Sequence, residues 1–187
     1  MSVKIYIDQG HNPDNPNAGA EGNGFREQDL VYSIGQRTAA MLRGYGFDVR
    51  LSRPAPDTQL GTSVASSLAA RVNDANAWGA DYFISLHCNA SDIESASGTE
   101  AFVYRRNTDA EWLAYRLVQG VTETTGLPDR GITARPGLYV LRKTRMPAVL
   151  VELGFITNPG DAALLAYSPN LFAEGLTDGI LRYLAPQ

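Results

Sequence analysis

The chain has 187 residues, 44% of them hydrophobic and 19% charged, and it carries a formal net charge of −4. This composition is typical of one globular domain, and the net negative charge argues against nucleic acid as a partner, because such binding requires a basic face. The single cysteine excludes a framework of internal disulfides and a cysteine-based zinc finger, and no apolar run approaches the length of a membrane-spanning helix.

The N-terminal part of the chain combines apolar strands, a polar loop and an amphipathic helix. Residues 3–9 and 47–52 are typical of strands, and a helix is predicted between them over 27–44. Strand, helix and strand in this order indicate a parallel, right-handed unit. The loop of residues 12–24 is rich in Gly, Pro and Asn, and a loop of this length within a compact domain is usually functional or disordered.

The rest of the chain continues the alternation of strands and helices. Residues 53–67, rich in Pro, Ser and Thr, are expected to form a surface loop. Further strands are expected at 82–89, 98–104, 138–141 and 148–154, and further helices at 68–78, at 109–125 and from residues 159 and 169 onward. Because no internal repeat or linker divides the chain, we predict a single α/β domain over residues 1–187.

Four residues with metal-binding or acid–base side chains stand out. The only two histidines, His11 and His87, each lie at the carboxyl end of a predicted apolar strand. Chemistry in open α/β sheets gathers beyond these strand ends, so both histidines are expected at one site. With Glu27, at the start of the first helix, they supply the three His/Glu ligands of a catalytic zinc site, which leaves one position for water. Glu152 is a carboxylate within an apolar strand, and beside a divalent cation it can act as a general base.

Each of these residues also has an ordinary structural interpretation. Each histidine can be a satisfied polar residue at a strand end, and Glu27 can be a first-turn acid that interacts favourably with the helix dipole. Glu152 can be a buried carboxylate paired with an arginine such as Arg130 or Arg142. The spacing does not discriminate between these alternatives, because the residues do not form a compact local zinc motif.

Five stretches in the same order resemble a known enzyme family. They are 7–11 (Ile-Asp-Gln-Gly-His) with the loop 18–22 and Glu27, then 85–90 (Ser-Leu-His-Cys-Asn-Ala), 98–100 (Gly-Thr-Glu), 146–150 (Met-Pro-Ala-Val-Leu) and 151–158 (Val-Glu-Leu-Gly-Phe-Ile-Thr-Asn). In these stretches the chain resembles the zinc-dependent N-acetylmuramoyl-L-alanine amidases of the Amidase_3 family. The resemblance extends from Lys4 to Leu184, and five stretches in register are more specific than any one of them.

The resemblance implies one Zn²⁺ per chain, held by His11, Glu27 and His87, with Glu152 as the catalytic carboxylate. It also implies a six-stranded, mostly parallel twisted sheet with helices on both faces. The implied reaction is hydrolysis, in peptidoglycan, of the amide between N-acetylmuramic acid and L-alanine of the stem peptide. The family often has alanine where Cys88 stands. Because strand neighbours face opposite sides, Cys88 is expected to point away from the metal and to pack in the core if His87 faces the metal.

Four further residues are candidates for contacts with the substrate. Glu100 can bind the substrate or support a ligand, although a solvent-facing strand glutamate is an equal alternative. Leu138, Tyr139 and Arg142 can line a cleft for the stem peptide, although an ordinary strand is the favoured interpretation of that segment.

Two other functions stay open from the sequence. A zinc carboxypeptidase or endopeptidase acting on stem peptides uses the same ligand types, and a non-catalytic wall-binding module binds peptidoglycan without a metal. For the amidase we expect peptidoglycan as the partner, no nucleic acid, no membrane insertion, and a monomer. The chain shows no signal peptide. An enzyme that acts at the bacterial cell wall would then be made in the cytoplasm and released, be delivered by a phage, or be part of a longer exported protein.

Overall fold

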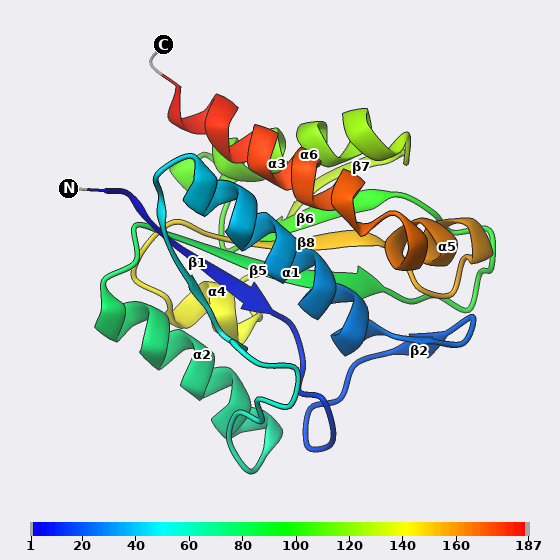
Figure 1. The fold of residues 1–187 in the computed structure, drawn as a ribbon, viewed down its shortest axis with the longest axis horizontal. Coiled ribbons are helices and arrows are strands. Elements are labelled where there is room, and N and C mark those ends of the chain that lie inside the picture. Colours follow the sequence, from blue (N-terminus) through cyan, green and yellow to red (C-terminus); the bar gives the residue numbers. More distant parts are fainter. Residues whose placement is uncertain (1, 186–187) are drawn as a thin grey trace.

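The computed structural model describes residues 2–185 and arranges them in three layers, with a six-stranded sheet between two layers of helices (Figure 1). In spatial order the strands are β4 (Asp48–Leu51), β1 (Lys4–Gln9), β5 (Tyr82–Asn89), β8 (Ala148–Phe155), β6 (Thr99–Val103) and β7 (Asp129–Ala134). The first four are parallel, β6 is antiparallel to β8, and β7 is parallel to β6. The expectation of a six-stranded, mostly parallel sheet is confirmed.

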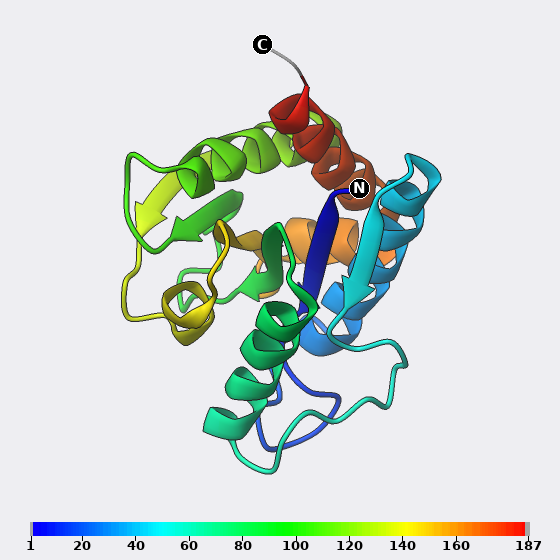
Figure 2. The same cartoon turned by 90° about the vertical axis from the view of Figure 1, so that its left-hand side faces the viewer.

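Helices cover both faces of this sheet (Figures 1 and 2). One face carries α1 (Glu27–Gly44), α3 (Asp109–Thr125) and α6 (Pro169–Leu184), and the other carries α2 (Val64–Trp78) and α4 (Tyr139–Lys143), while α5 (Pro159–Tyr167) follows β8. We call these the α1 face and the α2 face. Strand side chains alternate between them: Ile5 and Ile7 pack on the α1 face, and Tyr6 packs on the α2 face. Since both faces are covered, the central strands are nearly continuous apolar runs.

Three elements differ from the sequence prediction. The segment 138–141 is not a strand but leads into α4, and the sixth strand is β7, in a stretch predicted as a loop. A short apolar run does not separate helix from strand by periodicity, and β7 is a largely polar edge strand that pairs only with β6. Helix α2 begins at Val64, earlier than expected, because Ser63 and Ser66 form a capping box in which serine replaces the usual Glu or Gln.

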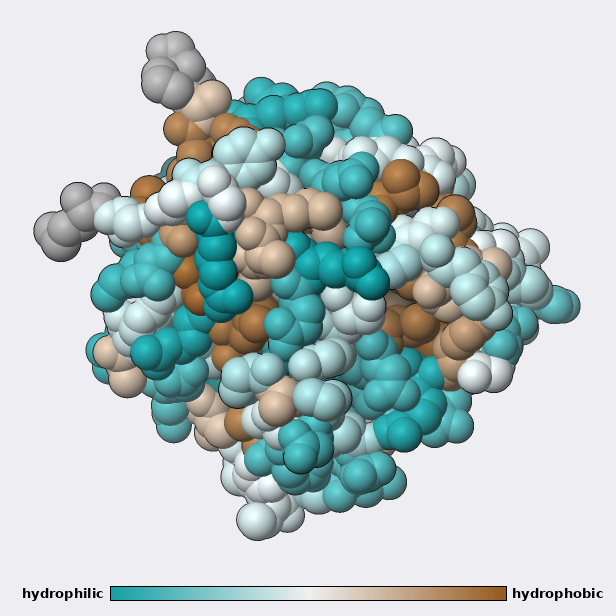
Figure 3. All heavy atoms as spheres, in the orientation of Figure 1, coloured by the Kyte–Doolittle hydropathy of each residue, from teal (hydrophilic) through white to brown (hydrophobic). Residues whose placement is uncertain are grey.

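The loop before α1 contains a small sheet that was not predicted, in which β2 (Glu21–Gly22) pairs with β3 (Phe25–Arg26). The surface seen in Figure 3 is mainly hydrophilic, and its hydrophobic residues lie in small separate groups, as is usual for protein surfaces. Among the helices formed by residues 2–185, none is both long enough and apolar enough to cross a membrane.

Candidate metal centre

The four candidate residues meet at the edge of the sheet where β1, β5 and β8 end. His11 follows β1, His87 lies in β5, and Glu152 lies in β8. His87 and Glu152 are direct neighbours in the register of the two parallel strands. Glu27 is the first residue of α1. Parallel strands bring their carboxyl ends to one edge, so residues from distant parts of the chain meet there.

The side chains of His11, Glu27 and His87 converge on one point. Three distances of 3.1 Å join His11 Nε2 to Glu27 Oε1, His87 Nδ1 to Glu27 Oε1, and the two imidazole nitrogens to each other. Ligand atoms bound tetrahedrally at about 2.0–2.2 Å from a zinc ion are roughly 3.3 Å apart, and imidazole nitrogen and carboxylate oxygen are ligands that zinc prefers. The residues therefore fit a metal ion, and the three of them can hold one.

Two glycines permit this convergence. A Cβ atom on Gly10 would lie 2.6 Å from the carbonyl oxygen of Leu86, so only glycine lets the end of β1 approach β5 this closely. A Cβ atom on Gly19 would lie 2.8 Å from Glu27 Oε2 and 2.9 Å from His11 Cδ2. The loop before α1 thus packs directly against two of the candidate ligands, and at Gly19 no side chain fits without displacing them.

Glu27 is held in place by bonds to both of its carboxylate oxygens. The side chain is 3% exposed; Oε1 accepts a bond from the Cys88 backbone N–H and Oε2 accepts one from the Ala20 backbone N–H, both at 2.9 Å. Burial acts to raise the pKa of this carboxyl group, but hydrogen bonds from His11 and His87, together with their charges, hold the pKa below its ordinary value. This geometry favours an ionised ligand over a solvent-exposed first-turn acid.

Glu152 has the opposite environment. Its Oε2 is buried and has no hydrogen-bond partner, and neither arginine considered for it from the sequence forms an ion pair with it among residues 2–185. Burial raises the pKa of Glu152 to about 8, the negative charges of Glu27 and Glu100 add to this effect, and the charge of Arg135 opposes it. Such a carboxyl group can gain or lose a proton near neutral pH.

Cys88 lies outside this cluster. Its side chain is 4% exposed and packs in the core on the α1 face, whereas His87, one residue earlier, points into the site. The expectation that Cys88 turns away from the metal position is confirmed, and strand alternation is the reason.

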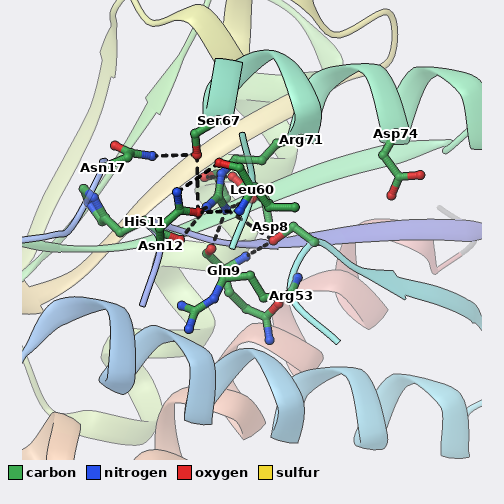
Figure 4. A network of polar contacts seen from close by, with 12 residues as sticks. Asp8, Gln9, His11, Asn12, Asn17, Arg53, Leu60, Ser67, Arg71 and Asp74 are labelled. Carbon is green, nitrogen blue, oxygen red and sulfur yellow. Dashed lines mark hydrogen bonds and ion pairs between the residues drawn. The ribbon is translucent and has the colours of Figure 1, made fainter. Parts of the chain in front are cut away.

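A buried polar network lies beneath His11, and the sequence did not indicate it (Figure 4). Arg71 of α2 is 1% exposed and donates hydrogen bonds to Asp8 Oδ1 and to the carbonyl oxygen of Gln9, each at 2.6 Å, and to the carbonyl oxygen of His11. Asp8 is also 1% exposed and accepts a second bond, at 2.7 Å, from the hydroxyl of Ser85. The network thus joins β1, β5 and α2 directly behind a candidate ligand.

This network fixes an unusual backbone conformation. His11 has a φ of +64°, in the left-handed region that residues other than glycine and asparagine seldom occupy. Arg71 binds the carbonyl of this residue, so it holds the conformation that directs the imidazole toward Glu27. The side chain of Asn12, fully buried, donates to the carbonyls of Pro16 and Leu60 and so ties two loops together.

The prediction of a surface loop over 53–67 is wrong at its first residue. Arg53 is 1% exposed, its backbone N–H donates to Gln9 Oε1, and its guanidinium donates to the carbonyl of Gln28. No pattern in the sequence distinguishes this arginine, or Arg71, from solvent-exposed ones, because arginines are seldom fully buried.

The candidates for substrate contacts lie in different places. Leu138 and Tyr139 line a cavity of about 130 Å³ that also touches His11 and His87. Arg142 is exposed and lies on another hollow of the surface.

Glu100 lies opposite Glu152 in the β6–β8 register. It is 18% exposed, accepts a bond from Asn89 Nδ2 at 2.6 Å, and lies 3.9 Å from Arg130 Nε. This burial argues against the solvent-facing alternative for Glu100.

Known proteins resemble this chain over nearly its whole length. A family profile described as N-acetylmuramoyl-L-alanine amidase (Amidase_3) matches residues 5–182. The chain is 34% identical over 186 residues to the N-acetylmuramoyl-L-alanine amidase CwlM of Bacillus licheniformis, covering 96% of this chain and 68% of that protein. It is 33% identical over 183 residues to the N-acetylmuramoyl-L-alanine amidase LytC of Bacillus subtilis (strain 168), covering 96% of this chain but only 35% of LytC. The chain therefore spans about a third of the length of that relative.

A solved structure shows the same fold. The catalytic domain of CwlV, an N-acetylmuramoyl-L-alanine amidase from Bacillus (Paenibacillus) polymyxa var. colistinus, matches with a TM-score of 0.85 at 31% sequence identity. The match covers 97% of this chain and 98% of that domain.

Proposed function

This chain belongs to the N-acetylmuramoyl-L-alanine amidase family, and we propose that it is a peptidoglycan hydrolase. In this proposal it uses Zn²⁺ to cleave the amide between N-acetylmuramic acid and the L-alanine of the stem peptide. The observation that carries the proposal is the convergence of His11, Glu27 and His87 at mutual distances of 3.1 Å, with Glu152 beside His87 on the neighbouring strand.

The three ligands have defined tasks in this proposal. His11, Glu27 and His87 hold the metal, and the ionised Glu27 contributes a negative charge. A Zn²⁺ ion held by these residues would supply Lewis-acid chemistry: it would lower the pKa of a bound water to about 7 and polarise a carbonyl group. The bonds from Ala20 and Cys88 keep the Glu27 carboxylate from rotating when the substrate arrives.

Glu152 carries the proton. It accepts a proton from the water as the water attacks the amide carbonyl, and it delivers that proton to the nitrogen of L-alanine as the C–N bond breaks. The products are the free lactyl carboxylate of N-acetylmuramic acid and a peptide with a free L-alanine amino group. The absence of a hydrogen-bond partner for its buried Oε2, among residues 2–185, supports this task, because no other bond must break first.

Membership of the family supports the amidase over the two alternatives. A zinc carboxypeptidase or endopeptidase would use the same ligand types, but the matching profile and relatives are named for the muramoyl–alanine amide. A non-catalytic wall-binding module has no need for a carboxyl group such as Glu152 beside a complete ligand set. We further propose that the enzyme acts at the bacterial cell wall and that it is a monomer. Sedimentation of the active protein as a dimer would contradict the proposed monomer.

The decisive experiment separates metal binding from catalysis. We expect Glu152→Gln to retain about one zinc per chain by metal analysis while the rate of wall hydrolysis falls by about 10²-fold or more, the range lost with a general base. Glu174→Gln is the matched control, because Glu174 is an exposed glutamate on α6. Wall digestion by the parent must produce new L-alanine amino ends without release of D-amino acids. A Glu152→Gln variant that hydrolyses walls at the parent rate would refute the assignment.

A further inference from the structure

Arg130 lies near the start of strand β7, Arg135 directly follows the strand, and both guanidinium groups lie over aromatic rings. The Cζ atom of Arg130 lies 4.9 Å from the centre of the Phe155 ring, and that of Arg135 lies 4.8 Å from the centre of the Phe102 ring. Cation–π contacts of this kind hold a guanidinium in one position while its N–H groups stay available. The edge strand therefore presents two positioned cations.

Arg135 lies over the face of the sheet that carries the metal centre. Its backbone N–H donates to the carbonyl of Val103 at 2.8 Å, and its own carbonyl accepts from the N–H of Leu138 at 3.1 Å. Phe102, beneath its guanidinium, packs on the α2 face and is the register partner of Leu150. Leu138 and Leu150 both line the cavity that touches His11 and His87. Figure 2 shows the loop that leads from β7 to α4 on this side of the molecule.

The two arginines differ in their charge partners. Arg130 lies 3.9 Å from the carboxylate of Glu100 and donates to the carbonyl of Ser97. Within residues 2–185 no carboxylate lies within ion-pair distance of Arg135, whose side chain is exposed. The backbone of Arg135 lies beside the end of β6, and its guanidinium extends over Phe102, level with Leu150 of the cavity that touches both histidines. Arg135 is therefore a positioned, solvent-accessible cation two residues along the sheet from the level of Glu152, and a guanidinium of this kind binds a carboxylate in a bidentate manner.

The spacing between Glu152 and the ring beneath Arg135 suits a substrate group that lies one or two peptide units from the scissile bond. Glu152 and Glu100 are direct cross-strand partners, and Phe102 is two residues further along β6. A diagonal of this kind in a sheet spans about 7–8 Å, which is roughly the length of two residues of extended peptide. A peptide whose first amide lies at Glu152 can therefore bring its second residue over Phe102, the ring against which the Arg135 guanidinium lies.

Resting on the proposed function, we propose that Arg135 binds a carboxylate of the stem peptide, at the residue that follows L-alanine. In peptidoglycan this residue is a D-glutamate linked through its γ-carboxyl group, so its α-carboxylate is free unless it is amidated. Arg135 would then make the enzyme prefer stems with the free acid over stems with D-isoglutamine.

The test compares two substrates that differ only in this group. With muramyl tripeptides that carry either the free α-carboxylate or its amide, we expect Arg135→Gln to raise KM for the acid on the order of tenfold, as for loss of a charged hydrogen bond. KM for the amide should change far less, and Arg135→Lys should lose only part of the preference. Arg43→Gln is the control, because Arg43 is an exposed arginine in the last turn of α1, on the other face of the sheet.

The outcomes separate this inference from the proposed function. Equal changes in KM or kcat for both substrates would show that Arg135 acts on Glu152 or on the fold, and unchanged values would show no contact; either result overturns the inference. Calorimetric binding of both peptides in a Glu152→Gln background measures the preference without turnover. If the acid binds more tightly than the amide and this preference is lost with Arg135→Gln, the inference is supported. If the parent cleaves neither peptide, the proposed function is refuted, but the binding preference still supports the inference about Arg135.

Discussion

Replacing Arg71 by methionine should cost much of the stability of the protein. Arg71 and Asp8 form an ion pair at 2.6 Å in which both side chains are 1% exposed. Methionine fills similar space but cannot donate hydrogen bonds. The buried carboxylate of Asp8 would then keep one side-chain bond, from Ser85, and the carbonyls of Gln9 and His11 would lose the bonds that Arg71 donates. Removing one partner of a buried pair costs about 3–5 kcal/mol, a large part of the roughly 5–15 kcal/mol that stabilises a typical domain.

The control is an ion pair with the same separation and different burial. Arg182 and Glu123 also lie 2.6 Å apart, but their side chains are 41% and 46% exposed, so solvent screens their attraction. Urea unfolding followed by circular dichroism should show a large loss for Arg71→Met and a far smaller one for Arg182→Met. Adding Asp8→Asn to Arg71→Met should recover part of the loss, because it removes the unpaired charge. Equal losses for Arg71→Met and Arg182→Met would refute the reasoning from burial.

The same pair predicts a pH dependence. Burial acts to raise the pKa of Asp8, but the charge of Arg71 and the bond from Ser85 hold this pKa below its ordinary value. Because the folded pKa is the lower one, the stabilisation is complete above the unfolded pKa of about 3.9 and is lost as the pH falls through the folded pKa. The difference in unfolding free energy between the parent and Arg71→Met should therefore shrink on acidification below about pH 4. A difference that stays constant down to pH 2 would contradict the charge-based explanation.

Three further outcomes follow from the site. Gly19→Ala should weaken zinc binding measured by competition with a chelator, because its Cβ would lie 2.8 Å from Glu27 Oε2, whereas Gly137→Ala, with open space around it, should not. Removal of metal by a chelator should lower the melting temperature and added Zn²⁺ should restore it, since a ligand at 100 times its Kd stabilises by about 2.7 kcal/mol; an unchanged melting temperature would contradict the metal centre. Cys88→Ala should keep its full zinc content while losing about 1 kcal/mol of stability, and loss of zinc would show that Cys88 is a ligand.

The sequence predicted the central elements because their signals are local. Continuous apolar runs identify β1, β5 and β8, and helical spacing identifies α1 with its bounds of Glu27 and Gly44. The candidate ligands could be predicted from residue type and from their position at strand ends. The edge strand β7 and the short helix α4 could not be predicted, because the first is largely polar and the second is too short to show a period.

The network beneath His11 also lies beyond sequence reasoning, for a different reason. Arg71 in α2 and Asp8 in β1 become partners only when the helix packs on the α2 face of the sheet, and nothing in either segment alone marks them as buried. The same holds for Arg135: its sequence context is an ordinary turn, and its guanidinium reaches Phe102, from where its charge acts on Glu152, only once β7 pairs with β6. Long-range contacts, rather than local propensity, decide which charged residues serve the site.

The two glutamates of the site have different roles because the backbone around them differs. Alternate residues of β5 bond to β1 and to β8: the carbonyl of Leu86 accepts from Gly10 beyond β1, and the carbonyl of Asn89 accepts from Ile156 beyond β8. The N–H of Cys88 is therefore on the β1 side, and because β1 ends at Gln9 this N–H has no strand partner and donates to Glu27. Glu152 lies between two paired strands, opposite His87 of β5 and Glu100 of β6, and within residues 2–185 no donor bonds its Oε2. One carboxyl group is therefore kept ionised, as a metal ligand must be, while the other is left able to exchange a proton, as a general base must be. The end of β1 thus leaves a backbone donor for the metal ligand, whereas the strands on both sides of Glu152 leave none for the base.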